Sequence, residues 1–225
     1  MRGRSPKRPR KPRRAGGAGG PPRREPRSSL SRAEGPVGSA FGRLEDALDL
    51  AWQLLIRAAR DRRAAWRTPA LATVSREGGA EVRTLVLRRV DRVAGALRFH
   101  TDRRSAKVAA IAACPEVGLI FWDPRRALQL RVGGTARLIA EGPEWAAAWA
   151  AVPEAARANY RTADAPGSAL PLAGPAPEAG DGAASFTLLD VVAEGLDLLW
   201  LGPGGHRRAG WVRGPDGWTG GWRVP

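Results

Sequence analysis

Apolar residues recur at steps of three and four positions between Ser39 and about Trp66. The residues that carry this period are Phe41, Leu44, Leu48, Trp52, Leu55 and Ile56. Such spacing puts the apolar side chains on one face of an amphipathic helix. We therefore expect one helix over 39–66 that packs across one side of the segments that follow.

Strand-like patterns follow this helix. Segments 70–74, 82–90 and 96–101 are rich in apolar and β-branched residues, and turn residues at Glu77-Gly78-Gly79 and near Gly95 separate them. We expect these strands to form an antiparallel meander. A short helix should follow from about residue 103 to residue 113, where Pro115 marks its end.

The second half of the chain continues in short segments. Strands are expected over 117–122 and 127–139, and Gly133-Gly134 indicates a bulge or sharp bend in the second. Helices are expected over 143–152 and 153–160. A loop rich in Pro, Gly and Ala then extends to about residue 183, and a loop of this length is either functional, for example as a lid, or mobile.

Four last strands are expected over 185–192, 195–201, about 207–212 and 218–224. Many short strands with few helices predict a mainly β fold, a closed or split antiparallel β-barrel. Nine tryptophans are present, and several lie in these last strands, where such residues usually fill cores or subunit interfaces.

The charge of the chain is concentrated at its N-terminus. Residues 1–36 hold +10 of the net charge of +15 and almost no apolar residues, so we expect a disordered basic arm before one domain over 37–225. Such an arm can bind nucleic acid or another polyanion weakly through counterion release. A solvated tail, or an upstream extension that is not always translated, is the alternative.

Several classes of protein are excluded by composition. No apolar run fits a signal peptide or a membrane span, so neither secretion nor a membrane location is expected. The single cysteine, Cys114, excludes an intrachain disulfide, which fits a reducing, cytoplasmic compartment. With only His100 and His206, we expect no multi-histidine metal site, and no nucleophile motif indicates a hydrolase.

The stretch from Arg83 to Gln129 carries the main candidate chemistry. A strand ends in Thr101-Asp102 and runs directly into the short helix, so either residue is a candidate N-cap. The free N–H groups of a helix start favour a phosphate, and Ser105 and Lys107 would lie beside it. A surface turn with ordinary solvated charges is the alternative.

Four segments in this region, with the end of the chain, resemble the FMN-binding split barrel of the pyridoxamine 5'-phosphate oxidase family. The segments are Arg83-Thr84-Leu85-Val86-Leu87-Arg88, Phe99-His100-Thr101-Asp102, Ser105-Ala106-Lys107 and Gln129-Leu130-Arg131-Val132-Gly133-Gly134. The resemblance covers roughly residues 71–140 and 186–225. It implies a split antiparallel β-barrel, FMN as cofactor and two-electron oxidoreductase activity on a small substrate or a reduced nicotinamide.

The resemblance also implies roles for individual residues, carried over by position. FMN would be bound by Arg83, Thr84, Leu85, Val86, Leu87, His100, Thr101, Ser105, Lys107 and Gln129, and by Trp200 and Arg208 from the partner subunit of a homodimer. Arg88 and His206 would face the substrate. No residue is assigned as a certain catalytic group, since the flavin carries the redox step.

The sequence departs from the family pattern at several positions. Ala106 replaces one phosphate-binding arginine, His100 stands where a tyrosine is usual, and Arg88 replaces a lysine. The helix after the strand 127–139 lacks the Tyr, Arg and Ser with which the family holds a substrate phosphate. These departures argue against vitamin B6 specificity. The alternative function is a non-catalytic flavin- or haem-binding module with a polyanion-binding arm.

Overall fold

The computed structural model describes residues 35–225, so the predicted basic arm lies almost wholly outside the described residues. The first elements are two helices, α1 (Gly35–Ala40) and α2 (Leu44–Arg60), and a 3-10 turn, Ala65–Arg67. The single helix predicted over 39–66 is therefore wrong in extent. Its apolar face is correct, because Trp52 and Leu55 of α2 are fully buried in the main core.

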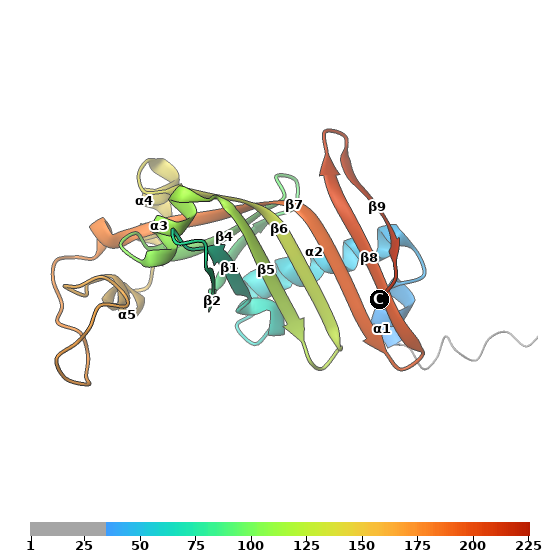
Figure 1. Cartoon of the computed structure of the whole chain (residues 1–225), viewed down its shortest axis with the longest axis horizontal. Helices are drawn as coiled ribbons and strands as arrows, with labels where there is room; N and C mark the ends of the chain where they lie inside the picture. The colour runs from blue at the N-terminus through green and yellow to red at the C-terminus, as the bar shows by residue number, and fades with distance from the viewer. Residues whose placement is uncertain (1–34) are drawn as a thin grey trace, which may run out of the picture.

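One antiparallel sheet makes up most of the fold (Figure 1). Its strands are β1 (Ala70–Val74), β2 (Ala80–Thr84), β3 (Leu87–Asp91), β4 (Ala96–Asp102), β5 (Glu116–Asp123), β6 (Leu128–Ile139), β7 (Phe186–Gly202), β8 (Gly205–Gly214) and β9 (Gly217–Arg223). The hydrogen-bonded order is β2-β1-β5-β6-β7-β4-β3, with β8 and β9 added beside β7. The predicted split antiparallel fold is confirmed, and the sheet is not closed.

The strand predicted over 82–90 is two strands. β2 pairs only with β1 and β3 only with β4, so these neighbours in sequence form opposite ends of the strand order. The predicted meander is therefore wrong beyond its two hairpins. Leu85 and Val86 carry the chain from one end to the other, and we call them the seam. This connection brings the two edges of the sheet together without hydrogen bonds between them.

The strands predicted over 185–192 and 195–201 are one strand, β7. Its first half pairs with β4, its second half pairs with β8, and β6 runs along nearly all of it. The register between β6 and β7 shifts at Gly133/Gly134, where an irregularity was predicted, but the additional residue is Glu194 of β7 and not a residue of β6. A close approach of Gly134 to the carbonyl oxygen of Val192 accompanies the shift.

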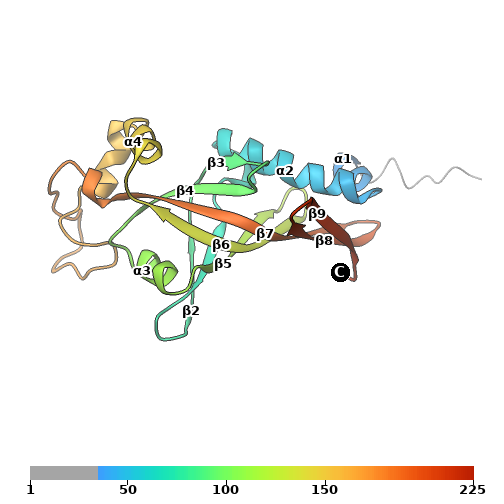
Figure 2. The ribbon, with the colours of Figure 1, turned by 90° about the horizontal axis from the view of Figure 1, so that it is seen from above.

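Helices cover the sheet unequally. Figure 2 shows α1 and α2 on one side of β7 and β8, with α3 (Ala106–Ala113) and the β1-β2 hairpin on the other side. At the far end, α4 (Pro143–Ala150) and the short α5 (Glu154–Arg157) pack on Phe186 and Leu188 of β7 in a second apolar cluster. A loop over 161–182 with one isolated bridge follows.

The strand registers define two faces of the sheet. Leu71, Leu119 and Val132 face inward to the core, whereas Ile120, Arg131 and Asp197 share the opposite, outer face. Around Ile120, Arg131 and Asp197, and over β8 and β9, no helix covers this outer face in the described part of the chain (Figures 1 and 2). Among residues 35–225, no helix combines the length and the apolar character that crossing a bilayer requires.

Candidate functional site

A group of cationic and hydroxyl side chains lies where β4 meets α3. The Nζ of Lys107 donates to the Oγ1 of Thr101 at 3.2 Å and to the Oγ of Ser105 at 3.0 Å. Thr101 and Ser105 are buried, and the Ser105 hydroxyl donates in turn to the carbonyl oxygen of Asp102 at 2.7 Å. The lysine thus has hydroxyl partners and no carboxylate within ion-pair distance in the described chain.

Arg83 of β2 completes this group, which we call the cation cluster. Its guanidinium donates to the Oγ1 of Thr73 at 2.6 Å and also pairs with the carboxylate of Glu81. Burial lowers the pKa of Lys107, and the nearby charge of Arg83 lowers that pKa further. Among residues 35–225, these two neighbouring cations thus have one carboxylate, that of Glu81, in direct contact, an arrangement that a bound phosphate would stabilise.

Thr73 is a member of the cation cluster that sequence reasoning missed. It lies in β1, on the same inward face as Leu71, and is only 3% exposed. Cross-strand pairing puts Thr73 opposite Glu81 and diagonally across from Arg83, two residue pairs along the ladder. A threonine at an inward position of an otherwise apolar alternation is the signal that could have found it.

The start of α3 differs from the prediction. The N-cap is Ser105, and the helix begins at Ala106 rather than near Arg103. Asp102 instead accepts hydrogen bonds from the backbone N–H of Arg104 at 2.8 Å and from its guanidinium. Because Arg104 is also bound to Thr162, it is held by the chain and is not free to replace the arginine absent at Ala106.

The seam and its flanks lie next to the cation cluster in sequence. Leu85 and Leu87 are buried in the core, whereas Thr84 is exposed and Val86 partly exposed. The Leu85 N–H donates to the carbonyl oxygen of Pro69 at 3.0 Å. Outside the two flanking strands this backbone has no ladder partner, so it can approach a ligand that the cluster holds.

Arg88 and His100 lie in a cavity that is separate from the cation cluster. They line a cavity of about 520 Å³ between the β3-β4 hairpin and the α4-α5 segment. His100 alternates with Thr101 along β4, so the two side chains point to opposite faces. The His100 ring packs edge-on against Phe186, and burial, with the charges of Arg88 and Arg98, lowers its pKa to about 4.

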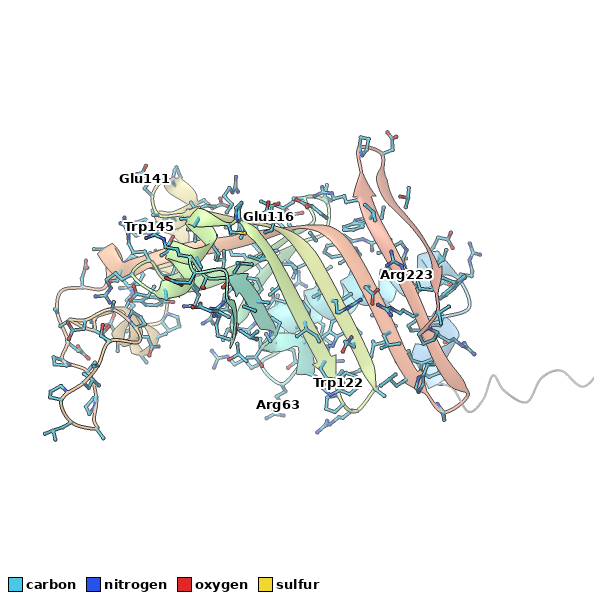
Figure 3. All side chains as sticks on the ribbon, in the orientation of Figure 1. Arg63, Glu116, Trp122, Glu141, Trp145 and Arg223 are labelled. Carbon is cyan, nitrogen blue, oxygen red and sulfur yellow. The ribbon has the colours of Figure 1, made fainter. Side chains whose placement is uncertain are left out.

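Two other predicted residues lie on the outer face of the sheet. Gln129 pairs with Trp122 and Leu199, and Leu199 in turn pairs with Arg208. The Arg208 guanidinium donates to both carboxylate oxygens of the buried Asp197, at 3.1 and 3.0 Å. Arg131 and Arg223 also contact Asp197, so three arginines share one carboxylate on this face; Figure 3 labels Arg223 and Trp122 there.

Trp200 and His206 lie away from both the cation cluster and the cavity lined by Arg88 and His100. The Trp200 indole is 3% exposed and stacks on Phe41, with ring centroids 5.8 Å apart, and the Arg207 guanidinium lies over it. The indole is therefore buried by residues of its own chain. His206 is exposed at the start of β8. One chain thus brings together Arg83, Thr101, Ser105 and Lys107, and separates them from Gln129, Trp200, Arg208 and His206.

Comparisons with known proteins agree with this fold. A family model described as pyridoxamine 5'-phosphate oxidase matches residues 55–196, more than half of the chain. The chain belongs to the pyridoxamine 5'-phosphate oxidase family. The match includes the cation cluster, the seam and the cavity, but ends before β8 and β9. Among curated proteins, no sequence matches this chain.

Two solved structures illustrate the variety within this fold. A pyridoxamine 5'-phosphate oxidase-related, FMN-binding protein from Nostoc punctiforme PCC 73102 has 26% identity and a TM-score of 0.65, and the match covers 78% of this chain and 96% of that chain. PhzG from Burkholderia lata 383, solved with tetrahydrophenazine-1-carboxylic acid, has 16% identity and a TM-score of 0.63, covering 79% and 92%. The second likeness concerns the fold alone.

Proposed function

We propose that this family member binds FMN and is an oxidoreductase that acts on a small substrate or a reduced nicotinamide. The observation that carries the proposal is the cation cluster. It offers two cationic side chains and three hydroxyls at one point, and the side-chain partners of Lys107 among residues 35–225 are hydroxyls. The FMN-binding relative of similar fold supports the choice of ligand.

In this proposal the cluster holds the FMN phosphate. Arg83 and Lys107 provide charge, and Thr73, Thr101 and Ser105 provide hydroxyl groups at hydrogen-bonding distance from them. The backbone from Thr84 to Leu87 would lie along the ribityl chain and the ring. When bound, FMN supplies two-electron redox chemistry, and the protein supplies anchoring, an apolar wall and hydrogen bonds to the ring.

We further propose a homodimer that completes this site. Gln129 and Arg208 lie on the outer face, whereas Arg83 and Thr73 lie on the inward face with Leu71, so one chain does not direct both groups toward one ligand. The uncovered outer face carries exposed apolar side chains at Val82, Ile120, Trp122 and Val212. Burial of these side chains against a second copy would favour association.

Arg208 and Trp200 differ in how easily each could reach a flavin bound by the partner subunit. Arg208 is on the outer face and can turn from Asp197 to a partner's ligand. Trp200 must lose the cover of Phe41 before its indole can contact a flavin. We therefore propose that Arg208, rather than Trp200, is the residue that the partner subunit contributes to FMN binding.

A visible spectrum of the purified full-length chain tests the proposal. We expect yellow protein, or apoprotein that becomes yellow with FMN, and loss of the flavin absorbance on anaerobic addition of NAD(P)H or of a reduced substrate. Colourless protein that does not take up FMN would overturn the proposal. Bound FMN that none of these donors reduces would favour the non-catalytic binding module instead.

A further inference from the structure

Another cavity lies where the end of α2 and the 3-10 turn after it meet the turn between β5 and β6, and we call it the turn cavity. Its volume of about 480 Å³ is within the range of small-molecule sites. The arginines that line it are Arg57, Arg63, Arg125 and Arg126. Figure 3 labels Arg63 near the end of β5. The turn cavity shares no lining residue with the cation cluster or with the cavity lined by Arg88 and His100.

Two of the four arginines are neutralised by aspartates. Arg57 pairs with Asp61 at 3.2 Å, and Arg126 pairs with Asp123 at 2.6 Å. The Asp123 residue is only 3% exposed, so its carboxylate is held inside the protein beside the turn that it organises. Both carboxylates are thus already used, and neither is available to the other two arginines.

Arg63 and Arg125 keep their charge without a carboxylate within ion-pair distance among residues 35–225. Each follows an aspartate by two positions, and that aspartate accepts its backbone N–H. The bond from Arg63 to Asp61 is 2.9 Å, and the bond from Arg125 to Asp123 is 3.0 Å. These bonds fix both turns, so the two guanidiniums are presented to one cavity from two distant parts of the sequence. An anion between them would reduce the repulsion of their like charges.

The rest of the wall is mainly apolar and contains an unused donor. Leu54, Ala64, Ala65 and Pro124 line the cavity together with Trp66. Trp66 is only 3% exposed, and its indole N–H has no hydrogen-bond partner in the described part of the chain. A buried donor without an acceptor is costly, so a ligand oxygen that reaches this N–H would gain binding energy.

These features favour a phosphate group on an organic molecule. A phosphate monoester has three acceptor oxygens and up to two negative charges, so it can bind two guanidiniums at once. We propose that the turn cavity binds a phosphorylated small molecule of about nucleotide size, with Arg63 and Arg125 on the phosphate and the apolar wall against the organic body. This site is separate from the proposed FMN site and does not depend on it.

Calorimetric titration of the full-length chain with adenosine, AMP and ADP tests the proposal, because the three share one organic body. We expect AMP to bind about tenfold or more tightly than adenosine, as charge-assisted hydrogen bonds imply, and ADP to bind at least as tightly as AMP. Arg63→Gln and Arg125→Gln should each weaken AMP about tenfold and leave adenosine unchanged. Equal affinities for adenosine and AMP, or AMP binding that both substitutions leave intact, would overturn the proposal.

Matched variants locate the binding. Arg76→Gln removes an equal charge from the exposed β1-β2 turn and should leave the AMP affinity unchanged. Lys107→Met alters the cation cluster and should also leave it unchanged. Arg63 and Arg125 are exposed, so the urea midpoints of their variants should match that of the wild type. AMP binding that is lost in Lys107→Met but kept in the Arg63 and Arg125 variants would assign it to the cation cluster and refute the turn cavity.

Two further ligands test the chemical class. Citrate carries a similar charge without phosphorus and should bind about tenfold more weakly than ADP. An oligothymidylate can bind through residues 1–36, so its affinity should be the same in the wild type and in the two variants. Citrate binding as tight as ADP binding would show a general polyanion site. Oligothymidylate binding that falls in both variants while AMP binding persists would show a nucleic-acid surface, and either result contradicts the proposal.

Discussion

Lys107 is the single lysine among residues 35–225, in a segment that otherwise uses arginine for its cations. A lysine ammonium is compact and has three rotatable donors, so it can bind two hydroxyls and a further oxygen at one point. Here two of these donors are used by Thr101 and Ser105. The third N–H donor of Lys107 can bind a ligand oxygen.

The first prediction concerns this side chain. Lys107→Met should weaken FMN binding about 10- to 100-fold, because a hydrogen bond to a charged group contributes about 1.5–3 kcal/mol. Titration of the apoprotein, followed by quenching of flavin fluorescence, measures the change. The unfolding midpoint should not fall, since burial and Arg83 disfavour the charged lysine, as its lowered pKa indicates. Unchanged FMN affinity would contradict the role of the cluster.

The second prediction concerns His100 and pH. Its pKa is about 4 in the fold and 6.5 in the unfolded chain. Between these values the unfolded chain binds more protons, so stability is lost as pH falls through this window and is unaffected above it. The loss between pH 7 and pH 5 should be roughly 2 kcal/mol. Urea denaturation of wild type and His100→Gln at both pH values measures this loss of stability. The variant should lack the part of the loss that comes from His100.

At the scale of elements, the register shift between β6 and β7 depends on one glycine. A Cβ on Gly134 would lie 2.0 Å from the carbonyl oxygen of Val192, whereas a Cβ on Gly133 meets nothing within 4 Å. The third prediction is therefore that Gly134→Ala destabilises by about 2–3 kcal/mol. Gly133→Ala is the matched control and should change the urea midpoint little. Equal midpoints for the two variants would show that the backbone adapts freely.

Local patterns predicted the elements better than their connections. The bounds of β1, β4, β5 and β6 follow from alternation and turn residues within a few positions. The division of 82–90 did not, because residues on both sides of Leu85 and Val86 have the same strand propensity. The two strands separate because β2 pairs with β1 and β3 pairs with β4. The alternation of apolar and polar residues along one segment does not show which strand it will pair with.

The same limit applies to the candidate site. Arg83, Thr101, Ser105 and Lys107 were found through their resemblance to a family motif, and the fold brings them together. Thr73 was missed because its role depends on the pairing of β1 with β2. The opposite directions of His100 and Thr101 do follow from the two-residue period of a strand, although the resemblance placed both along one cofactor.

At the scale of the molecule, the uncovered outer face leads to the fourth prediction. Ile120→Arg adds a cation near Arg131 on this face and should shift a dimer to monomer in sedimentation velocity experiments. FMN affinity should fall with it if the partner contributes Arg208. Val93→Arg is the control, since Val93 is exposed in the β3-β4 turn. A wild-type monomer that binds FMN fully would contradict the proposed dimer.

The long β7 also determines when the sheet can form during synthesis. It pairs with β4, β6 and β8, and the pairing of β4 with β7 joins residues about 90 positions apart. Contacts of such long range form late in folding. On the ribosome, β4 and β6 should therefore wait with unpaired edges until residues 186–202 emerge, so the nascent chain is exposed to aggregation or chaperone binding while residues 103–185 are synthesised.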